Sequence, residues 1–286
     1  MIRKAVIPAA GFGTRFLPAT KSQPKEMLPI VDTPVIQYVV EEAVLDGITD
    51  ILMVIGKGKR AIEEHFDRNV ELESELASKH KDAELALLRR ISEMADVHFV
   101  WQKQLKGLGD AVACARCHVG NEPFALLLGD TIVDSDPPAT RQLMDVFERY
   151  QESVVALEAV DPSKVSRYGI MAGKGLSKNL FLIEDFIEKP EPGEAPSNLA
   201  IAGRYILTPD VFGHIETLPP GKNGEIQLTD ALRRQVRNRA VYGWRVDGAR
   251  YDIGNKLDFI KTNIVFGLKR DDMRGDLMEF LKSLRT

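Results

Sequence analysis

Short apolar runs recur along the chain, and each is followed by a turn signal and then by a pattern of helical spacing. The runs are rich in β-branched residues and comprise Ala5–Gly11, Ile51–Gly56, Val97–Gln102, Phe124–Asp130 and Val154–Val160. Strands that are apolar on both faces belong to sheets that are covered by helices on both sides. Their alternation with helices predicts an α/β fold: a Rossmann-like, mixed, mostly parallel central sheet flanked by helices.

The segments between and after these runs predict further elements. A helix should begin near Pro34, which suits a first helical turn, and end at Gly47, which suits a C-terminal cap. The remaining predictions are amphipathic helices between Lys57 and Asp96, strands at Ala200–Leu207 and Ala240–Val246, and two helices between Asn255 and Leu284, broken near Lys269–Gly275.

The charge balance limits the classes of partner. The chain has 286 residues with 38 basic and 42 acidic side chains, a formal net charge of −4. A chain with this balance lacks the excess of positive charge that is typical of proteins that bind nucleic acid or an anionic membrane. The first apolar run is too short for a signal peptide, and no stretch reaches the roughly 20 apolar residues of a membrane span. We expect a cytoplasmic protein with no nucleic-acid or membrane partner.

The two cysteines stand in the string CARCH, with Cys114, Cys117 and His118. The string formally matches a haem-attachment or redox motif. Haem attachment requires export, and a zinc site would need a second pair of ligands. We therefore expect a short Ala-rich helix from Asp110 to His118, with both cysteines facing the core.

A glycine-rich loop, Ala9 to Pro29, follows the first apolar run. It contains Gly11 and Gly13, but Phe16 stands where a dinucleotide-binding turn needs its third glycine. The loop also lacks the GxxxxGK[ST] pattern of a phosphate-binding P-loop. These departures argue against an NAD-dependent oxidoreductase.

The loop is nevertheless suited to phosphate. Glycines let backbone N–H groups approach a ligand closely and form an anion-binding nest. Arg15, Lys21 and Lys25 add three cations within a short segment. The alternative, ordinary surface charges, is weaker because the glycines directly follow a buried strand. We expect a polyphosphate ligand here.

Motifs from residue 5 to about residue 260 carry a specific resemblance. The loop resembles the signature GxGTRxxPxTxxxPKxxLP of the sugar nucleotidyltransferases. Within that superfamily, the chain resembles the bacterial UTP:glucose-1-phosphate uridylyltransferases in PKEMLP, KGLGDAV (Lys106–Val112), Tyr168–Gly169, EKP (Glu188–Pro190), NLAIAGRYIL (Asn198–Leu207), EIQLTDA (Glu225–Ala231) and DIGNKL (Asp252–Leu257).

The resemblance implies an activity and an organisation. The enzyme would join UTP to glucose 1-phosphate, with Mg²⁺ as cofactor, and release UDP-glucose and pyrophosphate. We expect one domain of the nucleotide-diphospho-sugar transferase fold over residues 1–286. It would comprise a nucleotide-binding half (about 1–135), a sugar-binding half (about 136–265) and a helical tail (about 266–286). Family analogy suggests a homodimer or homotetramer. The tail, with apolar Met278, Phe280 and Leu281, would either contact another subunit or pack back on its own core.

The resemblance also assigns residues to the reacting groups. Arg15 and Lys25 would hold the triphosphate and stabilise departing pyrophosphate, and Lys189 would neutralise the sugar phosphate. Asp130, at the carboxyl end of a strand, and Asp252 would supply two oxygen ligands for Mg²⁺. The nucleotide would be bound by Ala9, Ala10, Gly11, Gly13, Gln102 and Gly107, and the sugar by Gly169, Glu188, Ala202 and Gly203.

Two positions depart from the family pattern: Asp110 replaces the usual histidine after GLG, and Gly129 replaces a proline before Asp130. Glucose-1-phosphate thymidylyltransferases share the glycine loop and are the nearest alternative. A nucleotide-sugar-binding protein that has lost its chemistry is a second. KEMLP, KGLGDAV and the charged segment from Lys57 to Asp96 favour the uridylyl enzyme over the thymidylyl one. The joint presence of Arg15, Lys25 and the other proposed reacting residues argues against a purely binding role.

Overall fold

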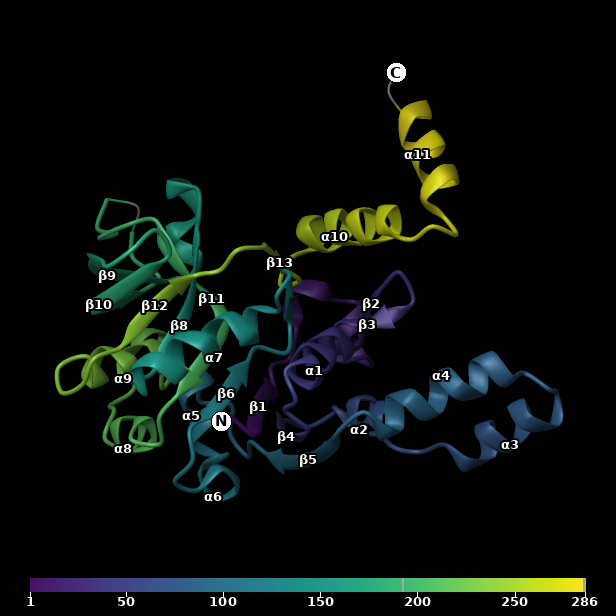
Figure 1. Cartoon of the computed structure of the whole chain (residues 1–286), viewed down its shortest axis with the longest axis horizontal. Helices are drawn as coiled ribbons and strands as arrows, with labels where there is room; N and C mark the ends of the chain where they lie inside the picture. Colours follow the sequence, from purple (N-terminus) through teal and green to yellow (C-terminus); the bar gives the residue numbers. More distant parts are fainter. Residues whose placement is uncertain (192, 285–286) are drawn as a thin grey trace.

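The computed structural model describes residues 1–191 and 193–284. Within them, nine strands form one sheet in the order β5-β4-β1-β6-β11-β8-β12-β10-β9 (Figure 1). These strands are β1 (Lys4–Ala9), β4 (Asp50–Ile55), β5 (Asp96–Trp101), β6 (Phe124–Leu127), β8 (Val154–Ala159), β9 (Gly169–Gly175), β10 (Leu180–Glu188), β11 (Leu199–Leu207) and β12 (Tyr242–Arg245). The mixed α/β fold is confirmed, and every apolar run that the sequence analysis placed in a strand forms one.

Parallel pairing is concentrated in the N-terminal half. Strands β5, β4, β1 and β6 are mutually parallel, and β8 pairs in parallel with β12. Strand β11 runs antiparallel to both of its main neighbours, and β10 runs antiparallel to β9 and β12. The mostly parallel character predicted for the sheet therefore describes its N-terminal half, whereas the C-terminal half is mainly antiparallel.

Helices cover both faces of the sheet. Successive strand residues point to opposite sides, so each strand contributes apolar side chains to both helix layers. Ala5 and Ile7 of β1 pack in the core cluster beneath α1 (Val35–Leu45) and α7 (Ala139–Tyr150), whereas Val6 belongs to the opposite cluster. That second cluster contains residues of α5 (Leu108–Ala113), α8 (Val211–Glu216) and α9 (Leu228–Gln235). The alternation explains why these strands are apolar throughout.

The helix expected from Pro34 to Gly47 is confirmed as α1. Pro34 immediately precedes its first residue, and Gly47 adopts a left-handed φ of 79°. The Gly47 N–H donates to the Val44 carbonyl at 2.9 Å, and the Ile48 N–H donates to the Ala43 carbonyl at 3.0 Å. These two bonds satisfy the last carbonyls of the helix in a Schellman motif.

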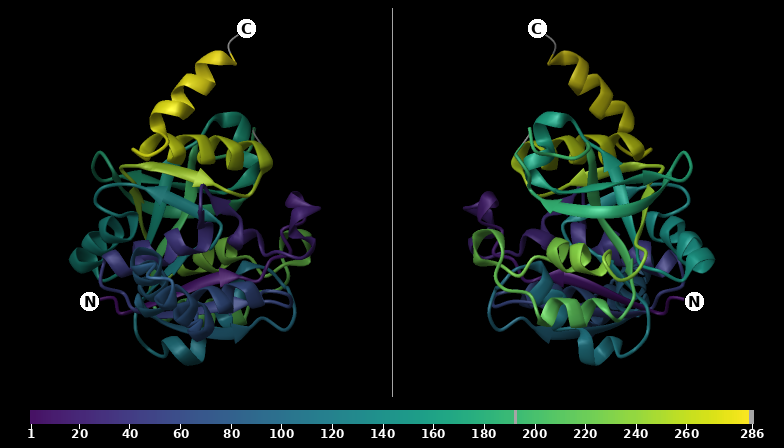
Figure 2. Two further views of the ribbon diagram at one scale, coloured as in Figure 1. Left: turned by 90° about the vertical axis from the view of Figure 1, so that its right-hand side faces the viewer. Right: turned by 90° about the vertical axis from the view of Figure 1, so that its left-hand side faces the viewer.

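Two helical segments project from the body (Figure 1). The charged segment forms α2 (Arg60–Phe66), α3 (Val70–Ser78) and α4 (Asp82–Glu93), and the chain ends in α10 (Lys256–Lys269) and α11 (Arg274–Ser283). Both sets of helices were predicted, including the break between the last two. Helix α11 stands away from the sheet in both views of Figure 2 and has no buried residue over Arg274–Ser283. Of the two alternatives for the tail, packing back on the main core is therefore wrong. Helix α11 contacts α10 instead, since a Cβ built on Gly267 would lie 2.8 Å from the Leu277 Cδ2.

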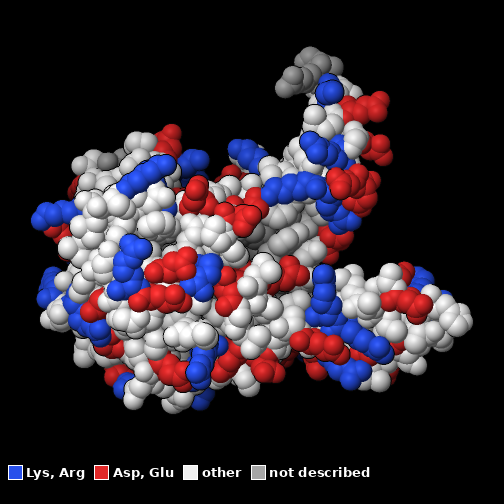
Figure 3. All heavy atoms as spheres, in the orientation of Figure 1, with Lys and Arg blue, Asp and Glu red and all other residues white. Residues whose placement is uncertain are grey.

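Two small sheets complete the fold: β2 (Pro29–Ile30) with β3 (Thr33–Pro34), and β7 (Thr131–Asp134) with β13 (Ala249–Asp252). Acidic and basic side chains are interspersed over the face drawn in Figure 3, as the nearly neutral balance suggests. None of the helices in the described part of the chain is long and apolar enough to cross a membrane.

The CARCH segment differs from the prediction. It forms two short helices, α5 and α6 (Arg116–Val119), rather than one. Cys114 is half-buried against the core, but Cys117 is exposed. Both cysteines were expected to face the core, and for Cys117 this is wrong because the chain turns between the two helices at Cys114 and Ala115.

Candidate active site

A cavity of about 510 Å³ opens where β1 ends and the glycine loop begins. Its lining includes most of the residues predicted to bind the nucleotide and the reacting phosphates: Ala10, Gly11, Gly13, Lys25, Gln102, Gly107 and Asp130. Ala9, also predicted, is 1% exposed in the core, and its neighbour Ala10 lines the cavity instead. Residues near position 10 and residues near position 130 thus meet at the carboxyl edge of parallel strands, where α/β proteins bind ligands.

The glycines of the loop make room for Lys25. Gly13 has a left-handed φ of 66°, and a Cβ built there would lie 3.0 Å from the Lys25 Cβ. A Cβ on Gly11 would lie 3.9 Å from the Lys25 Nζ. Phe16 is buried and makes an edge-on contact with Phe259, with ring centroids 5.6 Å apart. The loop therefore presents a lysine to the cavity instead of leading into a Rossmann-type helix.

Lys25 and Asp130 form an ion pair, with Nζ 2.5 Å from Oδ2. Burial opposes ionisation of Asp130, but the charge and hydrogen bond of Lys25 outweigh it and hold the pKa of the carboxyl below its ordinary value. For Lys25, burial lowers the pKa, but the charges of Asp130 and Glu26 outweigh that effect and raise it. Both groups are therefore charged near neutral pH.

A second ion pair lies behind the first and was not predicted. Glu26 and Lys59 are 1% and 4% exposed, and their Oε2 and Nζ are 2.7 Å apart. Burial raises the pKa of Glu26 and lowers that of Lys59. The pair ties the short 3-10 turn Lys25–Met27 to the segment before α2 and so fixes the turn that carries Lys25. Lys59 lies in a charged segment that looks like solvated surface in the sequence.

The two predicted metal ligands, Asp130 and Asp252, are brought together by the pairing of β7 with β13. We call the edge that carries these two residues the metal edge. Asp252 pairs in register with Thr131, and the Ile253 N–H donates to the Asp130 carbonyl at 3.1 Å. The Asp252 carboxylate accepts hydrogen bonds from the Tyr168 hydroxyl at 3.1 Å and the Gly254 N–H at 2.8 Å. These two bonds fix the orientation of the Asp252 carboxylate.

The donor set fits a hard divalent cation that shares its sites with substrate. Among residues 1–191 and 193–284, no three His, Cys, Asp or Glu side chains gather so as to hold a metal by themselves. Two carboxylates, Asp130 in the turn before β7 and Asp252 at the end of β13, match Mg²⁺, which keeps several waters and takes phosphate oxygens as further ligands. Such a site would be completed by bound phosphates.

A second cavity, of about 520 Å³, adjoins the metal edge and contains the other two predicted catalytic cations. Its lining includes Arg15, Lys189, Tyr168 and Asp252. Arg15 donates from Nη1 to the Gly254 carbonyl at 3.3 Å. Lys189 has a left-handed φ of 46°, a conformation rare for a residue with a side chain. The strained backbone is held by the bond from the Lys189 N–H to the Tyr168 carbonyl at 3.0 Å.

The predicted sugar residues come from three adjacent strands. Gly169 opens β9 and pairs in register with Glu188 at the end of β10. A Cβ on Gly169 would lie 3.3 Å from the Glu188 Oε2 and 2.9 Å from an Ile201 methyl. Ala202 and Gly203 lie where the register of β11 shifts, and Gly203 has a φ of 77° beside Leu128. The irregularity of β11 places this backbone next to the loop that carries Asp130.

Thr229 is a site residue that the sequence analysis missed. Its hydroxyl donates to the Glu188 Oε2 at 2.7 Å, and the Lys189 Nζ lies 2.9 Å from the Glu188 Oε1. Each oxygen of this carboxylate is therefore held by a different group. The signal was present in the EIQLTDA motif, but only the packing of α9 against β10 shows which of its side chains reaches Glu188.

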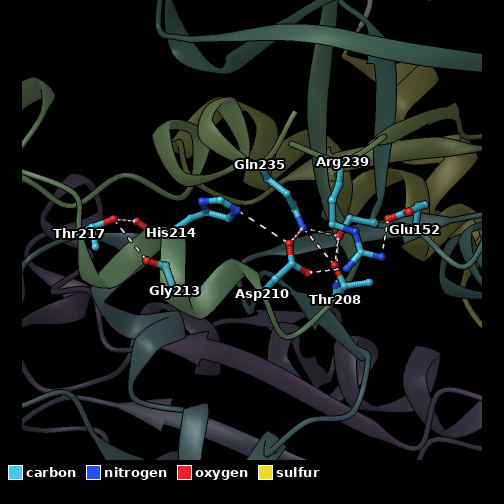
Figure 4. Close-up of polar contacts among 9 residues, drawn as sticks. Glu152, Thr208, Asp210, Gly213, His214, Thr217, Gln235 and Arg239 are labelled. Atoms are coloured by element: carbon cyan, nitrogen blue, oxygen red, sulfur yellow. Dashed lines mark hydrogen bonds and ion pairs between the residues drawn. The ribbon is translucent and has the colours of Figure 1, made fainter. Parts of the chain in front are cut away.

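The far end of α9 is anchored in a polar network (Figure 4). The Gln235 Nε2 lies 3.0 Å from the Asp210 Oδ2 and from the Thr208 Oγ1. Arg239 joins Asp210 to Glu152, with distances of 3.3 and 2.9 Å. The network fixes the helix that presents Thr229.

A buried ion pair, Arg204–Glu42, braces the loop before Asp130. Arg204 is 1% exposed and donates to the Glu42 carboxylate from Nε and Nη2, at 2.7 to 3.0 Å. Its guanidinium also donates to the carbonyls of Thr131 at 2.8 Å and Gly203 at 3.1 Å. One side chain therefore ties α1, the metal edge and the sugar strand together.

Comparison with known proteins agrees with this arrangement. A model of the nucleotidyl transferase family matches residues 4–265. UTP–glucose-1-phosphate uridylyltransferase 2 of Staphylococcus saprophyticus is 51% identical over 284 residues, which are 99% of this chain and 98% of that protein. A UTP-bound UDP-glucose pyrophosphorylase from Acinetobacter baumannii matches with a TM-score of 0.92 and 39% identity, over 100% of both chains.

A protein from Bacillus anthracis whose description as a glucose-1-phosphate thymidylyltransferase is an assignment is more distant. It has a TM-score of 0.72 and 25% identity, over 92% of this chain and 94% of that one. The match of the family model and the half-identical relative of nearly equal length lead to one conclusion: the chain belongs to the nucleotidyl transferase family.

Proposed function

We infer that the protein is a UTP:glucose-1-phosphate uridylyltransferase, which makes UDP-glucose and pyrophosphate. The observation that carries this is the match, at 51% identity and nearly full length, to a protein of that activity. The site supports the inference, because one edge of the sheet gathers cations, carboxylates and a nucleotide-sized cavity. The thymidylyltransferase alternative is supported less, since the corresponding structure is only 25% identical.

We propose that the reaction proceeds by in-line attack. A phosphate oxygen of glucose 1-phosphate forms a bond to the α-phosphorus of UTP, while the bond to the β-phosphate breaks and pyrophosphate leaves. With a second pKa near 6, the sugar phosphate is largely dianionic at neutral pH, so no general base is needed. The enzyme must instead overcome repulsion between two anions and stabilise the leaving group.

The proposed roles of the charged residues follow from their places. Lys25 and Arg15 hold the triphosphate and the departing pyrophosphate, and Lys189 neutralises the attacking sugar phosphate. Their side chains line the two cavities that adjoin the metal edge. We propose that Asp130 and Asp252 hold Mg²⁺. When bound, the cation would neutralise phosphate charge at this edge.

The neutral residues would position the two substrates. Ala10, Gly11 and Gly13 offer close backbone approach to the nucleotide phosphates, and Gln102 and Gly107 meet the base. Glu188 accepts hydrogen bonds from glucose hydroxyls, with its carboxylate held by Thr229. The backbone at Gly169, Ala202 and Gly203 would border the hexose ring, since Gly169 lies beside the Glu188 carboxylate and Gly203 beside Leu128 in the loop that carries Asp130.

The activity is tested by nucleotide preference. The protein, Mg²⁺ and glucose 1-phosphate are incubated with UTP or with dTTP, and the initial rate of pyrophosphate release is measured. We expect the higher kcat/KM with UTP. A clear preference for dTTP would assign the protein to the thymidylyl enzymes, and absence of turnover with both would leave a binding protein.

We further propose that the protein is a homodimer or homotetramer. Helix α11 projects from the body and exposes Met278, Phe280 and Leu284 at 40%, 57% and 60% (Figures 1 and 2). Burial of such side chains against a second subunit would remove them from water. Size-exclusion chromatography with light scattering should give a mass of two or four chains. A monomer at micromolar concentration would contradict this.

A further inference from the structure

The side chain of Gln102, which lines the nucleotide cavity, is held by two acceptors. Gln102 follows β5 and is 6% exposed. Its Nε2 lies 2.7 Å from the Asp110 Oδ2, on α5, and 3.1 Å from the Gly107 carbonyl oxygen. By resemblance to the uridylyltransferase motifs, Asp110 stands where a histidine is expected. The structure therefore gives this departure a definite contact.

The chemistry of these neighbours determines how the amide is oriented. An ionised carboxylate and a backbone carbonyl can only accept hydrogen bonds, so they require the NH₂ group of the amide to face them. The Gln102 Oε1 is then the atom left for a ligand in the cavity. An imidazole in place of Asp110 could donate or accept and would impose no such orientation.

We propose that Asp110 is a specificity-determining residue, which acts by holding Gln102 with its acceptor oxygen toward the base. Uracil carries a hydrogen-bond donor at N3, which such an acceptor recognises. Cytosine carries a lone pair at N3, which faces the same oxygen without a hydrogen bond. The site therefore selects UTP over CTP by the fixed orientation of one amide. This proposal rests on the inferred uridylyltransferase activity.

The test is the isosteric substitution Asp110→Asn. An asparagine can present either its oxygen or its NH₂ to Gln102, so only the Gly107 carbonyl still favours the original orientation of the Gln102 amide. With CTP bound, the rotated amide would donate from Nε2 to the cytosine N3. We expect kcat/KM with CTP to rise about tenfold, while the value with UTP changes less than about threefold. The rise is limited because rotation removes the hydrogen bond to the Gly107 carbonyl.

Two controls separate this role from structural damage. Cys114→Ser alters the next turn of the same segment, where Sγ contacts the Asp110 carbonyl at 3.3 Å, and it should leave both nucleotide rates unchanged. The KM for glucose 1-phosphate should also stay constant in Asp110→Asn. Damage to α5 would lower the rates with both nucleotides and would not create activity with CTP.

The outcomes are distinct. A rise in kcat/KM with CTP in Asp110→Asn, and no such rise in Cys114→Ser, supports the proposal. An unchanged CTP rate, or an equal fall with both nucleotides, overturns it while wild-type turnover of UTP leaves the enzyme assignment intact. If the wild-type protein does not turn over UTP, the assignment itself fails first.

Discussion

Replacing Asp130 by asparagine should lower kcat/KM for UDP-glucose formation by about a thousandfold, the scale expected when a charged group at the reacting phosphates is lost. The substitution removes one of two carboxylates at the metal edge and leaves Lys25 without its partner at 2.5 Å. Initial rates of pyrophosphate release, measured over a range of Mg²⁺ concentrations, would show the loss. Thermal unfolding should change less than on unpairing a fully buried charge, because the Lys25 and Asp130 side chains are 21% and 27% exposed.

Asp134→Asn is the matched control. Asp134 ends β7, the strand that begins directly after Asp130, and forms an exposed ion pair with Lys269 at the C-terminal end of α10. Exposed pairs contribute less than about 1 kcal/mol, and this one is outside the cavities. Activity should stay within about threefold of wild type. Full activity in Asp130→Asn, or an equal loss in Asp134→Asn, would remove Asp130 from the reaction.

Replacing Arg204 by methionine should lower the free energy of unfolding by about 3 to 5 kcal/mol, because Glu42 would remain buried and charged with hydrogen bonds from Thr140 but no cationic partner. The carbonyls of Thr131 and Gly203 would also lose their donor. Urea denaturation followed by circular dichroism measures the change. Activity should fall as well, because these carbonyls flank Asp130 and the sugar strand.

A control tests whether the loss of stability in Arg204→Met comes from the unpaired charge of Glu42. In the double variant Arg204→Met, Glu42→Leu neither charge of this pair remains, so most of the stability should return. Arg233→Met breaks the exposed pair with Asp185 and should cost less than about 1 kcal/mol. If Arg204→Met costs no more than Arg233→Met, the buried pair does not brace the site.

The fold, and the residues proposed to face the phosphates, could be predicted from local patterns and motifs. Apolar runs identified the strands because strands buried on both faces contain few polar residues. Gly47 and Pro34 predicted the ends of α1, since capping depends on residues close in sequence. Lys25 and Asp130 were recognised from motifs, and the structure places them 2.5 Å apart. Their roles in catalysis remain proposals.

The residues that support the site could not be predicted from local sequence patterns. Arg204 and Glu42 are 162 positions apart, and each alone reads as a surface charge. Lys59 looks like part of a solvated segment, but its ammonium is buried against Glu26. Cys117 was expected in the core and is exposed. The antiparallel half of the sheet, with β9 and β10, also lacked a strong apolar signal.

Asp110 illustrates the difference between what the sequence determines and what depends on the tertiary structure. Composition, periodicity and motifs determined an α/β chain with a phosphate-suited loop, because those signals depend on neighbours in sequence. That Asp110 turns the Gln102 amide was decided by the tertiary structure, since an amide's orientation depends on which donors and acceptors surround it. The same holds for the buried ion pairs: a charge is stable in the core only beside a partner that folding brings to it.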